Sequence, residues 1–161
     1  MFGGPSELIV QVADANDGGT ISLLRSIWHG DDEPGFERRI ADWLAVEGER
    51  RTTWLATLRD QPVGMASLFE YRRMPWPGRP DSRWGYVGNM FVREEFRNRG
   101  IGSALLRKLI ATAEERSYAR LVVSPSPRAV GLYRRAGFVV PDETGGAELL
   151  LLRPTARQPS G

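Results

Sequence analysis

The chain has 161 residues, of which 41% are hydrophobic and 26% charged, a composition typical of one globular domain and not of a disordered chain. It has no cysteine and a single histidine, His29, which excludes disulfides, thiolate metal sites and a cysteine nucleophile and disfavours a histidine-rich metal site. No run of 18 apolar residues is present, and the first residues do not resemble a secretory signal. We therefore expect a cytoplasmic protein that binds neither a metal nor a membrane.

The net charge of +2 is divided unevenly along the chain. Residues 1–70 carry a net charge of −6, and residues 71–161 carry +8. A basic half is typical of proteins that bind an anion, which here means nucleic acid, a membrane surface or a phosphorylated small molecule. Almost all the basic residues are arginine, which binds phosphate through two parallel hydrogen bonds, although a bias in the coding sequence explains the arginine content equally well.

The hydrophobic pattern changes period several times along the chain. Apolar residues at helical spacing predict helices, and β-branched or aromatic runs bounded by turn residues predict strands. In chain order we expect a strand at 8–12, helices at 21–28 and 36–47, strands at 52–58, 63–71 and 84–92, a helix at 103–116, a strand at 119–123, a helix at 125–135, and strands at 138–140 and 147–152. This order predicts an α/β (α+β) fold with a mixed sheet and helices on both faces, in one domain over residues 1–153 with a loose tail at 154–161.

The segment between the strand at 84–92 and the next helix has the features of an anion site. Gly100 and Gly102 allow close approach to the backbone at a helix N-terminus, where the first amide N–H groups lack partners. Arg97 and Arg99 add positive charge. Neither a P-loop nor a dinucleotide-binding glycine pattern is present, because the required third glycine is Leu105 and no G-x-x-x-x-G-K-[ST] match occurs.

Two stretches resemble the signatures of one enzyme family. Residues 97–102, RNRGIG, resemble the coenzyme A loop of the Gcn5-related N-acetyltransferases (GNAT), which reads [RQ]-x-x-G-x-[GA]. Residues 129–138, AVGLYRRAGF, are similar to the family's second signature, A-x-x-L-Y-x-x-x-G-F. The order and spacing of the two stretches also fit the family, and the resemblance extends over about residues 6–153.

The resemblance implies a GNAT-like sheet of six to seven mostly antiparallel strands and acetyl-CoA as co-substrate. It implies direct transfer of acetyl to a primary amine in a ternary complex, with Tyr133 beside the thioester sulfur and a main-chain N–H near Met90 polarising the acetyl carbonyl. Ser126 stands where the family often has asparagine. The implied cofactor-binding residues are Met90, Phe91, Val92, Arg97, Asn98, Arg99, Gly100, Ile101, Gly102, Ser103 and Ser126.

A general base is less clearly marked. Glu70, near the end of a predicted hairpin strand, is our first candidate for a catalytic base, although such a carboxylate equally suits a position facing solvent or Arg72. His29 is the second candidate. The resemblance places the acceptor near residues 29–39, 71–83 and 141–146.

The residues of these acceptor segments allow more than one interpretation. Asp31, Asp32 and Glu33 either attract a cationic amine or form a solvated acidic loop. The aromatic residues either wall a pocket or pack within a hairpin; they are Tyr71, Trp76 and Trp84.

Two further expectations concern function and partners. The alternative to an enzyme is a catalytically silent acyl-CoA-binding module that senses or regulates. No recognition helix, zinc pattern or aromatic RNA platform supports nucleic-acid binding, so none is expected. The apolar residues 149–152 suit either a homodimer contact through the C-terminal strands or a buried strand.

Overall fold

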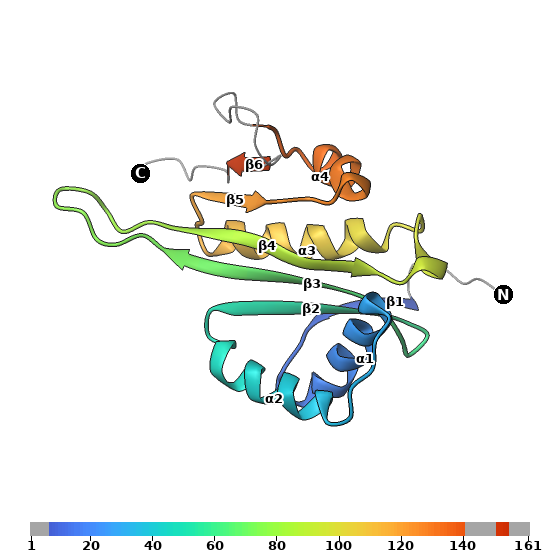
Figure 1. Ribbon diagram of the computed structural model, residues 1–161. Coiled ribbons are helices and arrows are strands. Elements are labelled where there is room, and N and C mark those ends of the chain that lie inside the picture. The colour runs from blue at the N-terminus through green and yellow to red at the C-terminus, as the bar shows by residue number, and fades with distance from the viewer. Residues whose placement is uncertain (1–6, 141–150, 155–161) are drawn as a thin grey trace.

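A computed structural model describes residues 7–140 and 151–154 of the chain (Figure 1). Within them, six strands form one sheet whose neighbours follow the chain order from β1 to β6. All neighbouring strands are antiparallel except β4 and β5, which are parallel, so the predicted mixed and mostly antiparallel sheet is confirmed. The strands are β1 (Leu8–Val12), β2 (Arg51–Leu58), β3 (Gln61–Arg72), β4 (Arg83–Val92), β5 (Arg120–Val123) and β6 (Leu151–Pro154).

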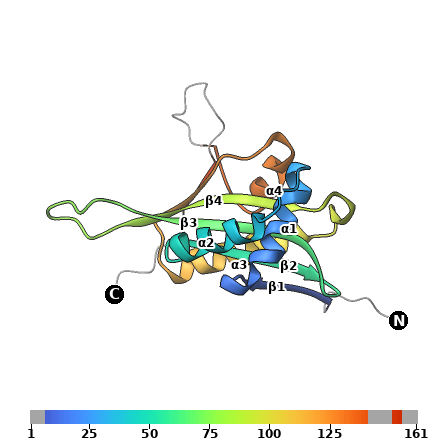
Figure 2. The same ribbon diagram turned by 60° about the horizontal axis from the view of Figure 1, so that its bottom comes forward.

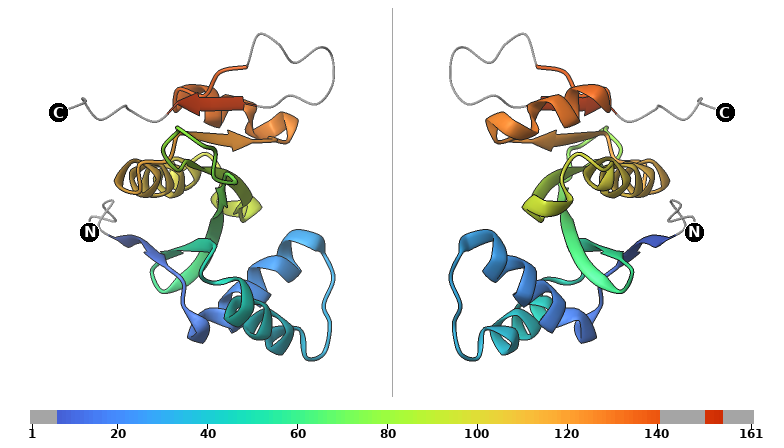
Figure 3. Two further views of the ribbon diagram at one scale, coloured as in Figure 1. Left: turned by 90° about the vertical axis from the view of Figure 1, so that its left-hand side faces the viewer. Right: turned by 90° about the vertical axis from the view of Figure 1, so that its right-hand side faces the viewer.

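Helices cover both faces of the sheet, as predicted. Figure 3 shows α1 (Gly18–His29) and α2 (Phe36–Glu47) on one side and α3 (Ile101–Glu115) on the other. The short helix α4 (Val130–Arg135) follows β5 through a 3₁₀ turn. The sheet therefore separates two environments that are formed by different helices.

Alternation along the central strands sends successive side chains into two separate cores. Leu55 and Met65 pack with Ile21 and Leu24 of α1, all of them buried. Their neighbours pack against α3 and α4 in a larger core, which includes Trp54, Ala66, Leu68, Leu105, Leu109 and Tyr133. A residue's position in a strand thus determines which set of helices its side chain contacts.

Two irregularities in β4 shape the middle of the sheet. Met65 is paired with Phe91 and Ser67 with Gly88, so Asn89 and Met90 lie opposite the single residue Ala66. This is a β-bulge, and Asn89 adopts a left-handed conformation with φ of 52°. On its other edge β4 pairs with β5 only from Gly85 to Val87, so the last part of β4 is left without a β5 partner.

The hairpin of β3 and β4 extends beyond the rest of the sheet, as Figures 1 and 2 show. Other boundaries differ from prediction. Helix α3 begins at Ile101 and not at residue 103, the predicted helix at 125–135 is a 3₁₀ turn at Pro127–Ala129 followed by α4, and residues 138–140 contain a single bridge at Val139. Of the predicted last strand, residues 147–150 lie outside the described residues, as does the predicted tail after Pro154. No helix in the described ranges is long and apolar enough to cross a membrane.

Candidate functional site

A cleft of about 780 Å³ lies where β4 diverges from β5. Its walls are the end of β4, the loop before α3, the first turn of α3, and the segment that contains α4. Every residue predicted to bind the cofactor lines it except Arg99, whose guanidinium lies over the ring of Phe96. The predicted residues that line the cleft are Met90, Phe91, Val92, Arg97, Asn98, Gly100, Ile101, Gly102, Ser103 and Ser126.

The loop before α3 and the first turn of this helix line the cleft with their backbone. Asn98 and Gly100 have positive φ, 63° and 80°, and Gly100 is the N-cap residue of α3. No side chain caps the helix, and the first intrahelical bond runs from the Ala104 N–H to the Gly100 carbonyl over 3.0 Å. The preceding N–H groups of the first turn have no intrahelical acceptor and lie at the positive end of the helix dipole. Such an arrangement binds phosphate.

Gly102 lets a ligand approach the floor of the cleft closely. A methyl group in place of its hydrogen would lie 3.4 Å from Leu132 Cδ2 and 3.9 Å from Val92 Cγ2, so larger side chains would fill the gap between β4 and α4.

Arg97 holds the loop against the strand, because its Nε–H donates to the Val92 carbonyl over 3.1 Å. The guanidinium therefore orders the loop in addition to supplying charge.

Several residues that line the cleft are not among the predicted cofactor-binding residues, and three of them add charge or a large aromatic ring. Arg128 and Arg135 bring positive charge from the opposite wall, and Trp28 reaches the cleft from the end of α1. The ring of Trp28 stacks on Phe91, with centroids 5.1 Å apart and planes at 9°. A signal for the arginines exists in the sequence, since residues 93–135 carry a net charge of +6.

The bulge in β4 places polar backbone groups in the centre of the site. The extra residue of a bulge has no partner in the ladder, and here Met90 lies beside an edge that β5 does not cover. An N–H group at this position is a suitable donor to an oxygen that becomes negative during acyl transfer. The glycine–asparagine pair Gly88-Asn89 within a strand is a sequence signal for such a bulge.

Tyr133 lies within α4, is 2% exposed and is not among the residues that line the cleft. Its ring meets Phe138 edge-on, with centroids 5.3 Å apart, and its hydroxyl makes no hydrogen bond to another described residue. Burial raises the pKa of the Tyr133 hydroxyl well above its usual value, and the nearby Tyr86 adds to this. The phenol is therefore neutral throughout the physiological pH range and is a weak acid.

Glu70 does not line the cleft. Its neighbours Phe69 and Tyr71 point to the other face of β3, whereas the Glu70 carboxylate accepts a hydrogen bond from the Tyr118 hydroxyl, on the α3 side, over 2.8 Å. Two arginines complete its environment, with Arg72 Nε at 2.8 Å and Arg83 Nη1 at 3.4 Å.

This environment does not support the predicted role of general base. Burial alone raises the pKa of the Glu70 carboxyl, but the hydrogen bonds from Arg72 and Tyr118 and the charges of Arg72 and Arg83 outweigh it and leave that pKa below its usual value. The carboxylate thus binds a proton less readily than a free glutamate. Glu70 also pairs with Gly85 of β4, several residues along the strand from the bulge.

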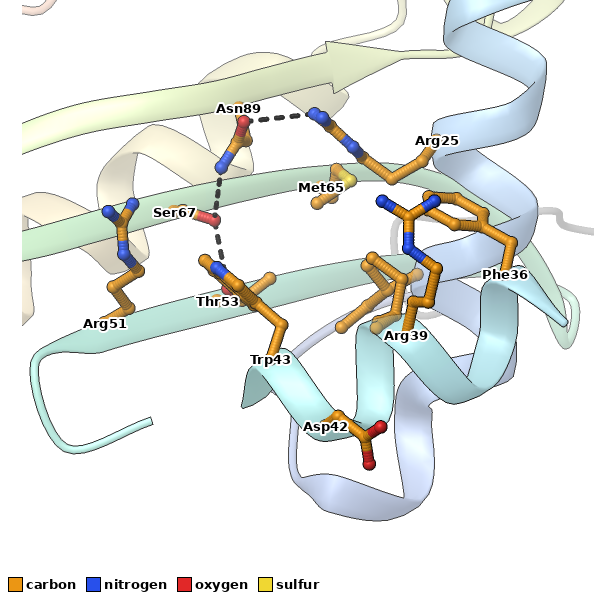
Figure 4. A pocket seen from close by; sticks show the side chains of 12 residues that line it. Arg25, Phe36, Arg39, Asp42, Trp43, Arg51, Thr53, Met65, Ser67 and Asn89 are labelled. Atoms are coloured by element: carbon orange, nitrogen blue, oxygen red, sulfur yellow. Dashed lines mark hydrogen bonds between the residues drawn. The ribbon is translucent and has the colours of Figure 1, made fainter. Parts of the chain in front are cut away.

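A second cavity of about 640 Å³ lies on the α1 and α2 side of the sheet (Figure 4). A chain of hydrogen bonds crosses its floor. The hydroxyls of Thr53 and Ser67 are 3.0 Å apart, Asn89 Nδ2 donates to Ser67 Oγ over 3.4 Å, and Arg25 Nη1 donates to Asn89 Oδ1 over 3.2 Å. Asn89 lines this cavity and Met90, the next residue, lines the cleft, so the bulge borders both spaces.

Only part of the predicted acceptor region borders this cavity. From residues 29–39, Phe36 and Arg39 line it, while Asp31 and Asp32 border a separate surface depression and Glu33 is paired with Arg39. The acidic residues therefore do not form the wall of the cavity.

The remaining acceptor predictions have different outcomes. Tyr71 packs on Trp84 at 4.9 Å within the extended hairpin, and Trp76 lies under Arg79 near its tip, which supports hairpin packing over a pocket wall. His29 stacks on Trp28 at 5.2 Å but lines neither space. Residues 141–146 lie outside the described residues, and so does the predicted dimer contact at 149–152 except for the backbone of its last two residues.

Comparison with known proteins decides the family. The model of the acetyltransferase (GNAT) family matches residues 19–138, which span both the cleft and the second cavity. The chain belongs to the GNAT family. It is 29% identical over 113 residues to the uncharacterized N-acetyltransferase YafP of Escherichia coli (strain K12), an alignment that covers 70% of this chain and 57% of the relative. It is 26% identical over 97 residues to the thialysine N-epsilon-acetyltransferase of Caenorhabditis elegans, covering 58% of each.

Solved structures share the GNAT fold. The crystal structure of a predicted acetyltransferase from Clostridium acetobutylicum, determined with acetyl-CoA, has a TM-score of 0.68 and 21% identity over 84% of this chain and 92% of that chain. A GNAT-family acetyltransferase from Streptococcus pneumoniae has a TM-score of 0.71 and 19% identity over 93% of this chain and all of that chain. The chain spans slightly more than half of the length of the two curated relatives.

Proposed function

We propose that this GNAT protein transfers acetyl from acetyl-CoA directly to a primary amine while both substrates are bound. One observation carries the proposal: the cleft combines a strand edge that β5 does not cover, a bulge beside that edge and a helix N-terminus without a side-chain cap. These three elements match the three parts of acetyl-CoA, which are an amide-bearing arm, a thioester carbonyl and a pyrophosphate.

The residues of the cleft divide the binding between them. The backbone of Met90–Val92 would pair with the pantetheine arm as an added strand would. The N–H groups of Ile101, Gly102 and Ser103 would bind the pyrophosphate, with Arg128 and Arg135 neutralising charge from the facing wall. Ser126 lines the same wall and would donate to the arm through its hydroxyl.

The reaction then needs few protein groups. The unprotonated amine nitrogen attacks the thioester carbon, and the carbonyl oxygen becomes negative and receives a hydrogen bond from the Met90 N–H. The attacking nitrogen then loses one proton to water, and the carbon–sulfur bond breaks to leave an amide and the thiolate of coenzyme A. The Tyr133 hydroxyl would donate a hydrogen bond to that thiolate. No cysteine is available in the sequence for an acyl-enzyme, so direct transfer is favoured over a covalent relay.

A protonated amine must lose one proton before its nitrogen can attack the thioester. Deprotonating an amine of pKa about 10 at pH 7 costs about 4 kcal/mol. Because Glu70 lies on the other face of the sheet, we assign this proton to solvent water in the second cavity and not to a carboxylate base. The rate should therefore follow the fraction of unprotonated amine as the pH rises.

Two measurements on the purified chain test the proposal. Thermal unfolding with and without acetyl-CoA should show a stabilisation of about 2.7 kcal/mol at a concentration 100 times the Kd, equivalent to a rise in Tm of about 5–11 °C. Release of free thiol from acetyl-CoA should then depend on an added primary amine. Stabilisation without thiol release on any amine would favour the alternative of a silent acyl-CoA-binding module. No stabilisation at millimolar acetyl-CoA would refute both.

A further inference from the structure

The second cavity has a charge opposite to the one that a cationic acceptor requires. Three arginines line it, Arg25, Arg39 and Arg51, against the single carboxylate of Asp42. A protonated amine would be repelled by this lining, whereas an anionic group would be attracted. The net negative charge of residues 1–70 therefore does not describe the lining of the cavity.

The three arginines differ in whether their charge is already balanced. Arg39 makes two hydrogen bonds to Glu33, at 2.6 and 2.7 Å, and Arg51 contacts Glu47 at 3.3 Å. Within residues 7–140 and 151–154, no carboxylate lies within ion-pair distance of Arg25. Of these three arginines, Arg25 is therefore the one that is left to donate hydrogen bonds to a ligand carboxylate.

Arg25 is also held in one position. Its Nη1 donates to Asn89 Oδ1, and its guanidinium lies 5.3 Å from the centroid of the Trp28 ring. Asn89 is fixed in turn by Ser67 and Thr53 (Figure 4). A guanidinium held by neutral partners keeps its charge and several N–H donors for a ligand, and it loses less side-chain entropy on binding.

The position of Arg25 relative to the bulge limits the shape of the ligand. Arg25 bonds to the side chain of Asn89, and the N–H proposed to polarise the acetyl group belongs to Met90, the next residue, whose Cα lies about 3.8 Å further along the chain. A reactive amine and an anion of the same ligand must then be only a few bonds apart. In an α-amino acid, one carbon separates the amine from the carboxylate.

The remaining lining of the cavity is largely apolar. Ile21 and Met65 come from α1 and β3, and Phe36, Ile40 and Trp43 come from α2. A volume of about 640 Å³ is within the range of small-molecule sites. We propose, on the basis of the acetyltransferase function above, that the acceptor is an α-amino acid with an apolar side chain, its carboxylate bound by Arg25 and its side chain packed against α2.

Matched pairs of amines test this inference. L-Leucine is compared with 3-methylbutylamine and with L-leucinamide, and L-phenylalanine with 2-phenylethylamine, in the presence of saturating acetyl-CoA. Each kcat/KM is calculated from the concentration of unprotonated amine, so that differences in amine pKa between the paired compounds do not affect the comparison. If Arg25 forms a charge-assisted hydrogen bond with the carboxylate, kcat/KM for each amino acid should be about ten- to hundred-fold higher than for its neutral partner.

Two variants assign the preference to Arg25. Arg25→Gln should remove most of the preference by raising KM for the amino acids about tenfold or more, with less than a threefold effect on the neutral amines. Arg38→Gln is the control, because it removes the same charge from an exposed position on α2 that does not line the cavity. It should leave the preference unchanged.

The possible failures are distinguishable. Equal or better transfer to the neutral amines, or equal effects of Arg25→Gln on both members of a pair, would overturn the inference while leaving the acetyltransferase function intact. Failure of both amino acids to be acetylated while acetyl-CoA still stabilises the chain would also overturn it. Loss of the acetyl-CoA stabilisation itself would instead refute the proposed function.

Discussion

Replacing Tyr133 by phenylalanine, with the pH dependence of the wild type beside it, tests how the hydroxyl acts at the leaving sulfur. A phenol of pKa 10 can protonate a thiolate whose conjugate acid has a pKa of about 8.5 only at a cost of about 2 kcal/mol. Burial raises the pKa of Tyr133 further, which makes full transfer more costly still. The hydroxyl is therefore expected to stabilise the thiolate by donating a hydrogen bond without giving up its proton.

The size of the expected effect follows from that role. A hydrogen bond to a charged acceptor contributes about 1.5–3 kcal/mol, so Tyr133→Phe should lower kcat by about ten- to hundred-fold. The aromatic ring is retained, and with it the contact to Phe138, so the Tm should stay within about 2 °C and the Kd of acetyl-CoA within about threefold.

Stopped-flow or steady-state thiol release, measured from pH 6 to 10, provides the assay. Because the pKa of Tyr133 is raised, the wild type should show no loss of kcat from ionisation of this phenol below pH 10. An unchanged kcat in Tyr133→Phe would remove the hydroxyl from the mechanism. A basic decline in kcat near pH 8 that disappears in the variant would contradict the reasoning, since it would require a tyrosine with a lowered pKa.

Three further changes test other parts of the structure. Glu70→Gln should leave kcat/KM unchanged and lower the stability at pH 7 by about 1–3 kcal/mol. Because the folded-state pKa of Glu70 is lowered, this difference is fully present above the unfolded pKa and should be lost as the pH falls through the folded-state pKa, a trend that chemical denaturation at several pH values would detect. Arg97→Ala should weaken acetyl-CoA binding about tenfold by calorimetry, and an unchanged Kd would show that backbone groups suffice. Gly100→Ala should lower the stability by about 1 kcal/mol because its φ is 80°, whereas Gly102→Ala should raise it by about 0.5 kcal/mol within α3; shifts of the same sign in Tm would refute the assigned conformations.

The features that the sequence predicts well are local. The loop at residues 97–102 lies between a strand and a helix that its own residues define, so the position of Gly100 before α3 follows from the motif and the periodicity. The long apolar face of α3 is likewise readable from its spacing, and its residues are buried as expected. Local chemistry therefore suffices to place one wall of the cleft.

The features that the sequence does not predict depend on long-range packing. Trp28 and Arg135 reach the cleft from α1 and α4, and Arg128 reaches it from the 3₁₀ turn before α4. The charge of residues 93–135 indicates a basic region but does not indicate which side chains reach the cleft. For Glu70 the alternation of β3 indicates that it shares a face with Leu68, but only the packing of α3 on that face shows that Glu70 lies on the opposite side of the sheet from the second cavity. The charge of a chain segment was also a poor guide, since Arg25 lines the cavity in an acidic half of the sequence.

The most direct test of the central claim is a map of backbone N–H resonances by NMR during titration with acetyl-CoA. If the cleft between β4 and α4 binds acetyl-CoA, the largest shifts should fall on Met90 and on the first turn of α3 from Ile101 to Ser103. Shifts confined to other parts of the chain, or no shifts at millimolar acetyl-CoA, would contradict the claim that this cleft is the acetyl-CoA site.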